Sequence, residues 1–250
     1  MRSYPYAAFL SYSSRYADWV EALHANLEAT LARHGESRPV YLDRIDVAAG
    51  ASWVTQLAAG VDQAAKLVLV VTPEALSSPR VGDEWQALVD SRRNWSHGHL
   101  VPVMLVWAPL PLFLGPIQYV DFRGHDDSGY ADKLRELAGA LLDLPPRRSR
   151  QLGLPSDLSL PKVPEPAMPE GRLRELVARL VHEISDDGRR RALGKALGRD
   201  VHGPRHYGGG AAAAATLVVE VGEDEIVAVL ERLQMVETRA VKGSPGSRHS

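Results

Sequence analysis

Apolar residues along the first 145 positions of the chain follow two alternating periods. Short apolar runs predict five β-strands, at residues 6–12, 39–44, 67–72, 100–107 and 117–123. Apolar residues three or four positions apart predict helices between them, at 17–34, from Ser52 onward, at about 81–92 and at 130–144. The third run, LVLVVT, is apolar on both faces, which is typical of a central parallel strand. The pattern therefore predicts an α/β domain on an open, doubly wound sheet of five parallel strands.

Polar residues stand where several of these strands end. Ser11 and Asp43 lie at the ends of the first and second predicted strands, and the third strand leads into a loop that reaches Glu84. Parallel strands end at one edge of their sheet, and open sheets bind ligands beyond that edge. We therefore expect these three side chains to gather there.

The second part of the chain has a different pattern. Residues 146–170 contain repeated prolines and few large apolar groups, which predicts a semi-extended linker that does not pack. Helical spacing returns over 171–237 and predicts a small helical module, interrupted by a low-complexity loop at 203–215 (GPRHYGGGAAAAA). Residues 238–250 are predicted to be a disordered tail.

Composition excludes several kinds of site. Lys and Arg number 29 against 31 Asp and Glu, so a net charge of −2 argues against a broad nucleic-acid surface. The chain has no cysteine, which excludes disulfides, thiolate zinc sites and a cysteine nucleophile. Its nine histidines lack metal-ligand spacing, so no metal site is predicted. No apolar run is long enough for a secretory signal or a bilayer span, and we expect a soluble, cytoplasmic protein that does not bind membranes.

Four segments carry a family resemblance. In chain order they are AAFLSYSS (7–14), VYLDRIDVAAGASW (40–53), LVLVVTPEALSSPRVGDEWQAL (67–88) and IQYVDFR (117–123). Together they resemble the Toll/interleukin-1 receptor (TIR) family, particularly bacterial TIR proteins, over roughly residues 5–145. The resemblance implies a flavodoxin-like sheet of five parallel strands.

The resemblance also implies an activity. Enzymatic TIR domains cleave the bond between nicotinamide and ribose in NAD+, which they consume as a substrate without any other cofactor. Their catalytic glutamate falls on Glu84 of this chain. Candidate substrate-binding residues are Phe9, Ser11, Asp43 and Arg80. The family often has an aromatic residue four positions before the glutamate, and Arg80 replaces it here, which removes a stacking surface for nicotinamide.

The chemistry explains why one carboxylate could suffice. Nicotinamide in NAD+ is already a cationic leaving group, so it needs no proton donor. Its departure builds oxocarbenium-like positive charge on the ribose, which an ionised carboxylate stabilises or traps covalently. Neither a metal ion nor a redox step is required.

Each candidate also has a structural interpretation. Asp83 and Glu84 would be favoured in the first turn of a helix by the helix dipole, by about 0.3–1 kcal/mol. Ser11 could bond its own backbone in a turn, and Asp43 could hold the loop that follows it. Phe9 could be a core residue of its strand, and Arg80 could simply be solvated.

Three functions remain open on the sequence alone. The first is an NAD+ glycohydrolase or cyclase, activated by self-association in bacterial immune (antiphage) signalling. Its C-terminal module, which faintly resembles effector-associated or death-like adaptor modules, would bind a protein partner. The second is a non-catalytic adaptor that acts through TIR–TIR contacts, and the third is a nucleoside deoxyribosyltransferase-like enzyme. Glu84 favours an enzyme, whereas Arg80 favours the adaptor.

Overall fold

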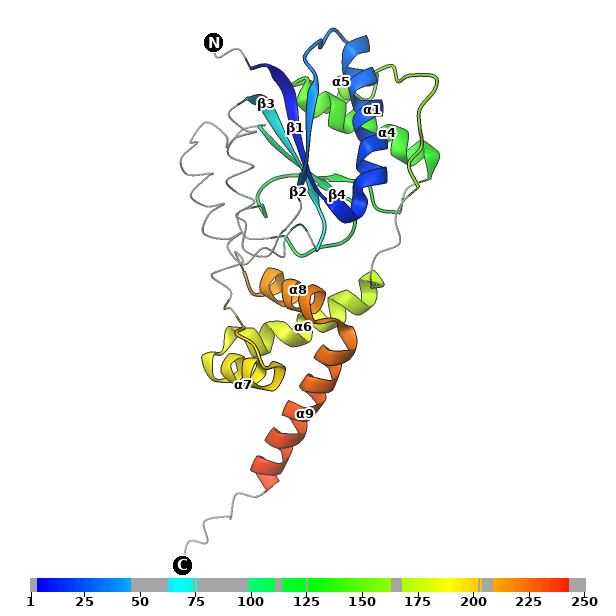
Figure 1. Ribbon diagram of the computed structural model, residues 1–250. Helices are drawn as coiled ribbons and strands as arrows, with labels where there is room; N and C mark the ends of the chain where they lie inside the picture. The colour runs from blue at the N-terminus through cyan, green and yellow to red at the C-terminus, as the bar shows by residue number, and fades with distance from the viewer. Residues whose placement is uncertain are drawn as a thin grey trace, which may run out of the picture.

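The computed structural model describes residues 4–45, 63–73, 75, 99–110, 114–124, 126–162, 168–201, 203 and 209–242, with only the backbone described at 43–45 and 235–242. The α/β part contains β1 (Tyr6–Ser13), the short 3-10 helix η1 (Ser14–Tyr16), α1 (Ala17–Arg33), β2 (Val40–Ile45), β3 (Ala64–Val71), β4 (Leu100–Met104), β5 (Val120–Asp121), α4 (Asp127–Leu141) and α5 (Pro146–Ser149). The helical module follows, with α6 (Glu170–Ser185), α7 (Asp187–Leu197), α8 (Gly210–Val221) and α9 (Glu223–Lys242) (Figure 1).

The five strands form one parallel sheet in the order β2-β1-β3-β4-β5, which confirms the predicted fold class. The order reverses direction at β1, because β2 pairs along one side of it and β3 along the other. This switch point is where open sheets of this order form a ligand crevice. Strand β5 is shorter than the predicted run 117–123, and it pairs only with Val103 and Met104 of β4.

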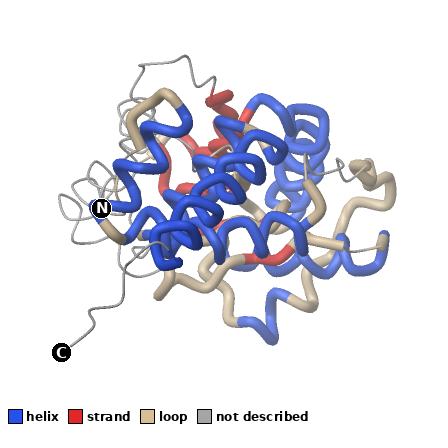
Figure 2. The backbone as a smooth tube through the Cα atoms, turned by 90° about the horizontal axis from the view of Figure 1, so that it is seen from below, coloured by secondary structure: helices blue, strands red, loops and turns tan. Residues whose placement is uncertain are grey.

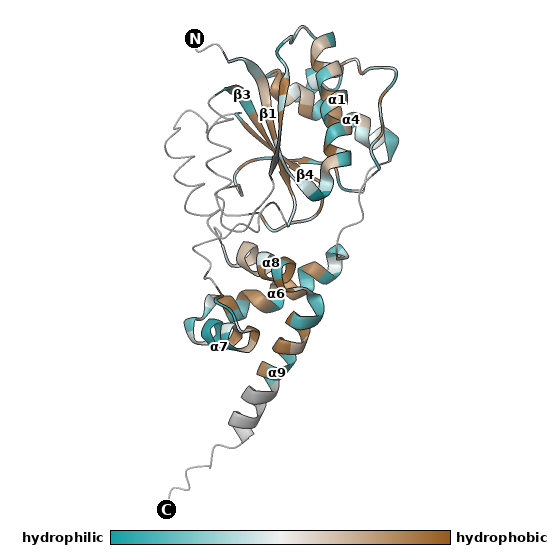
Figure 3. Cartoon of the chain, viewed as in Figure 1, coloured by the Kyte–Doolittle hydropathy of each residue, from teal (hydrophilic) through white to brown (hydrophobic). Residues whose placement is uncertain are grey.

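Side chains of β1 alternate between two hydrophobic clusters. Ala8, Leu10 and Tyr12 belong to the cluster that includes the inner faces of α1 and α4. Phe9 belongs to a cluster on the other side, with apolar residues of β3 and β4. Figure 3 shows the resulting band of hydrophobic residues through the strands. The strand-period pattern of the sequence therefore corresponds to a sheet buried on both faces.

Capping aspartates set the start of two helices. The Asp126 carboxylate accepts a hydrogen bond from the Gly129 N–H at 2.9 Å, so α4 begins at Asp127, earlier than the predicted Tyr130. The Asp186 carboxylate accepts one from the Arg189 N–H at 2.8 Å and separates α6 from α7. That hydrogen bond also lowers the pKa of Asp186.

The segment that follows α5 packs against the domain, so the prediction of an unpacked linker is wrong for residues 146–160. Leu152 is buried in the cluster of α1 and α4, and Leu154 and Leu158 pack against that cluster. The buried Asn26 side chain holds this segment by accepting from the Ser159 N–H at 3.0 Å and donating to the Ser159 carbonyl at 2.5 Å. The leucines that stand between the prolines make these apolar contacts. The average composition of the segment, which is rich in proline, does not reveal them.

The helical module contradicts two further predictions. The stretch predicted as a loop at 203–215 contains the first half of α8. Seven consecutive residues of this helix, Ala212 to Val218, are buried. Alanine has the highest helix propensity, and its small side chain lets α6 lie close alongside. The glycine after α8, Gly222, has φ of +94° and allows α9 to begin at once. Helix α9 continues to Lys242, so the tail predicted disordered from residue 238 is helical that far.

Within the described ranges, no helix combines the length and apolar character needed to cross a bilayer.

The Asn26 contact gives a stability prediction. Replacing Asn26 with Ala removes both bonds to Ser159 and a third to the Tyr130 hydroxyl at 2.9 Å, so the free energy of unfolding should fall by about 2 kcal/mol. Trypsin cleavage after the exposed Lys162 should also become faster, because the preceding segment is no longer held. Urea unfolding and timed digestion measure the two effects. Tyr130→Phe is the control, since it keeps Ser159 bound, and equal cleavage rates for all three proteins would contradict the prediction.

Candidate functional site

The candidate site lies at the carboxyl edge of the sheet, where β1 and β3 end beside each other. Ser11 pairs in register with Leu69 of β3 and with Asp43 of β2. Thr72 follows β3 directly and is fully buried. Its hydroxyl accepts a hydrogen bond from the Ala75 N–H at 3.1 Å, which turns the chain away from the strand. The reversal of strand order therefore places Ser11 beside the point where the chain leaves β3.

The Ser11 hydroxyl is an unsatisfied buried group. The side chain is 0% exposed, and Oγ has no hydrogen-bond partner among the described residues. A buried hydroxyl without a partner costs about 1–3 kcal/mol, and such groups are rare in folded proteins. Ser11 shares a sheet face with Phe9, because alternate residues of a strand point the same way. A ligand group that bonded to Oγ would remove this cost.

Phe9 lies deeper in the same face of the sheet. Its ring is buried and stacks on the ring of Tyr41 with centroids 5.5 Å apart and an interplanar angle of 15°. The position two residues before Ser11 sets it back from the carboxyl edge. These contacts account for Phe9 as a core residue of β1.

The other predicted site residues are described only in part or not at all. Asp43 lies in β2 directly across from Ser11, but its side chain is outside the described residues, as are Arg80 and Glu84. The structure thus brings Ser11 and the backbone of Asp43 together. The assignment of Glu84 as the catalytic acid stays a prediction.

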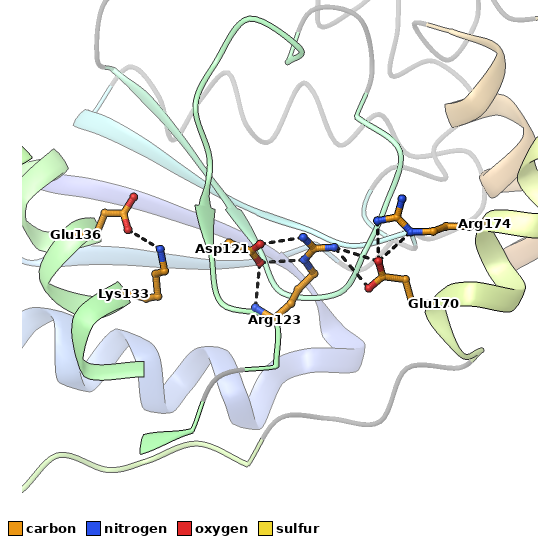
Figure 4. Close-up of polar contacts among 6 residues, drawn as sticks. All are labelled: Asp121, Arg123, Lys133, Glu136, Glu170 and Arg174. Carbon is orange, nitrogen blue, oxygen red and sulfur yellow. Dashed lines mark hydrogen bonds and ion pairs between the residues drawn. The ribbon is translucent and has the colours of Figure 1, made fainter. Parts of the chain in front are cut away.

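Sequence reasoning missed a polar contact between this edge and the helical module, which we call the edge contact. It comprises Asp121, Arg123, Glu170 and Arg174, which Figure 4 draws, together with Trp107. The Arg123 guanidinium donates to both carboxylate oxygens of Asp121 at 2.9 and 2.8 Å, and to Glu170 at 3.3 and 3.4 Å. The Asp121 bonds are the main cause of a raised Arg123 pKa, so the guanidinium stays charged.

Glu170 connects the two parts of this contact. Its carboxylate also accepts from the Arg174 guanidinium at 2.9 and 2.7 Å, and the same guanidinium lies 4.3 Å from the ring centroid of Trp107. The strand-end sequence Asp121-Phe-Arg123 signals a local ion pair. No local pattern could identify Glu170 as a partner, since it is 47 positions further along the chain.

A groove of about 1200 Å³ lies at the opposite edge of the sheet. Its lining includes Leu100 and Val120, which begin β4 and β5, and residues of α4 and α5. The ion pair between Lys133 and Glu136 lines it and is a local contact within α4 (Figure 4). Because it opens beyond the amino ends of these strands, this groove is not the ligand crevice expected from the fold. Among the described residues, no three His, Asp or Glu side chains gather as metal ligands would.

Comparison with known proteins identifies the family. A model of the TIR domain matches residues 8–138, just over half of the chain, and the protein therefore belongs to the TIR domain family. One similar solved structure is the TIR domain of the Toll-related receptor TRR-2 from Hydra magnipapillata. It is 16% identical, with 55% of this chain and 98% of that chain covered and a TM-score of 0.35. The curated proteins contain no match to the chain.

The unsatisfied hydroxyl gives a direct test. Ser11→Ala should leave the free energy of unfolding unchanged or raise it by up to about 1 kcal/mol, because no hydrogen bond is lost. The matched control is Ser149→Ala, which removes another buried hydroxyl, one that donates to the carbonyls of Leu144 and Pro145 at 3.4 and 3.3 Å. That variant should lose about 1 kcal/mol in the same urea titration. An equal loss in Ser11→Ala would mean that Ser11 is satisfied in the folded protein.

Proposed function

We propose that the protein is a TIR-domain NAD+ glycohydrolase or cyclase, activated by self-association in bacterial immune (antiphage) signalling. The observation that carries the proposal is the buried, unsatisfied Ser11 hydroxyl at the switch point of a TIR sheet. A nucleotide sugar presents hydroxyl and amide groups that such a hydroxyl can bond. NAD+ is the substrate in this reaction, and no resident cofactor or metal ion is invoked.

In the proposed reaction the bond between C1′ of the ribose and N1 of nicotinamide breaks, and both of its electrons leave with neutral nicotinamide. The Glu84 carboxylate stabilises the cation that develops at C1′. Attack by water on C1′, with loss of a proton, yields ADP-ribose, and attack by a ring nitrogen of the adenine yields a cyclic product. Ser11 and Asp43 would bind the ribose end of the substrate, and Arg80 would pair with the diphosphate.

Self-association supplies the control that such an activity requires. Hydrolysis of NAD+ depletes a metabolite that the cell needs, so an enzyme of this kind must be inactive until triggered. TIR domains associate with one another, and we assign the recruitment of a protein partner to the helical module. That module has its own buried core, formed by α6, α7, α8 and α9.

A non-catalytic adaptor is the second candidate, and Arg80 is the observation that favours it. An arginine in place of the family's aromatic residue offers nicotinamide a weaker stacking surface. A chain without turnover would then act through TIR–TIR contacts alone. Base exchange between deoxynucleosides would instead indicate the deoxyribosyltransferase-like enzyme.

The decisive measurement is nicotinamide release from NAD+ by the full chain, dispersed and artificially clustered on a multivalent scaffold. We expect turnover that rises on clustering and falls at least a hundredfold, by a rough estimate, in Glu84→Gln, which keeps the shape of the side chain but removes its charge. The matched control is Asp83→Asn, which removes the neighbouring charge and should retain activity.

The same assay separates the alternatives. If the clustered protein turns over neither NAD+ nor deoxynucleosides, the result supports the non-catalytic adaptor. Equal turnover in Glu84→Gln and the parent would refute Glu84 as the catalytic acid.

A further inference from the structure

The helical module lies across the carboxyl edge of the sheet. The two residues of the α/β part that reach it in the edge contact follow strands at that edge: Trp107 comes after β4, and Arg123 after β5. Trp107 also packs against the hydrophobic cluster of the module. Viewed from below, the helices of the module lie in front of the strands (Figure 2). The module therefore stands beyond the carboxyl ends of β4 and β5, at the same edge of the sheet as the switch point between β1 and β3.

The side chains of Ser11, Ser13 and Thr72, which the structure describes at this edge, are closed to solvent. Ser11 and Thr72 are 0% exposed, and Ser13, the last residue of β1, is 7% exposed. The groove at the amino edge and a smaller one between α6 and α9 are both lined by other residues. A ligand can reach the Ser11 hydroxyl only if part of the protein moves.

The ion pairs of the edge contact are weak enough for the contact to form and break reversibly. Its charged side chains remain partly solvated, with exposures of 24% for Arg123, 34% for Asp121, 42% for Glu170 and 51% for Arg174. Ion pairs this exposed contribute little free energy and are screened by salt. They can orient the module on the sheet without making its docking permanent.

Glu170 is the residue on which this contact depends. It is the first residue of α6, where the helix dipole favours a carboxylate, and it accepts from arginines on both sides of the boundary. Without it, Arg123 would lose its partner in the module, and Arg174 would lose the group that holds its guanidinium beside Trp107. One substitution should therefore weaken the whole edge contact.

We propose that the edge contact holds the helical module closed over the carboxyl edge of the sheet, and that its release admits the substrate to Ser11. The closure is a property of the fold and can be measured without catalysis. Its consequence for turnover rests on the proposed function, with NAD+ as the substrate that is excluded.

Because the chain has no cysteine, a single introduced thiol can report whether the carboxyl edge of the sheet opens to solvent. Ser11→Cys introduces a single thiol at the buried edge, and its rate of alkylation by N-ethylmaleimide reports access. Adding Glu170→Ala should raise that rate roughly three- to tenfold, the range expected for losing two exposed ion pairs, and 1 M NaCl should raise it in the parent Ser11→Cys protein.

Two controls restrict the interpretation to the edge. Glu175→Ala removes another exposed glutamate of α6, which pairs with Arg172 inside the module, and it should leave the Ser11→Cys rate unchanged. Thr30→Cys places the thiol at a fully buried position within α1, and Glu170→Ala should not accelerate its alkylation unless the whole domain unfolds. An unchanged Ser11→Cys rate in the Glu170→Ala background, or an equal increase at Thr30→Cys, would overturn the proposal.

Turnover is measured separately, in chains that keep Ser11. Glu170→Ala should release nicotinamide roughly three- to tenfold faster than the parent at a concentration where the parent is dispersed. If alkylation accelerates but an active parent and the variant turn over NAD+ equally, closure does not control substrate access and that part of the proposal is wrong. If no variant turns over NAD+ while alkylation still accelerates, the proposed enzyme fails and the closure stands.

Discussion

Parallel pairing of the strands is the constraint on which the rest of this structure depends. Because all five strands run in one direction, their carboxyl ends meet at a single edge, and every residue that follows a strand is brought to it. The strand order reverses between β1 and β3, and at this point the buried Ser11 hydroxyl has no hydrogen-bond partner among the described residues. The same edge receives Trp107 and Arg123 from β4 and β5. The candidate site and the contact to the helical module therefore share one location.

Polar groups at this edge differ in how completely they are satisfied. Thr72 bonds the backbone that follows it, and Arg123 has carboxylate partners on both sides. Ser11 alone among the buried side-chain polar atoms of the described residues lacks a partner. An unsatisfied group persists in a folded protein when the surrounding sheet holds it in place and a ligand can offset its cost. Under the proposed function, that ligand is a nucleotide.

Much of the fold could be predicted from the periodicity of apolar residues. Strands buried on both faces give continuous apolar runs, and these runs allowed the strands of the sheet to be predicted from residue 6 onward. The failures have a common physical cause. The local sequence does not show whether the alanines of α8 or the leucines around Leu152 are buried. Their burial depends on which other segment of the chain covers them. In the sequence, Asn26 looks like an ordinary helix residue, and only the structure shows that it is hydrogen-bonded to Ser159.

The sequence by itself determined the class of sheet, the family, and the residue types available for chemistry, because periodicity and motif spacing are local properties of the chain. Only the tertiary structure decided which hydroxyl is left without a partner, that the chain after α5 packs, and that Glu170 joins Arg123 across 47 positions. Burial and ion pairing depend on distances through space between segments far apart in the chain. Those distances follow from how the sheet and the helices pack, which no short stretch of sequence encodes.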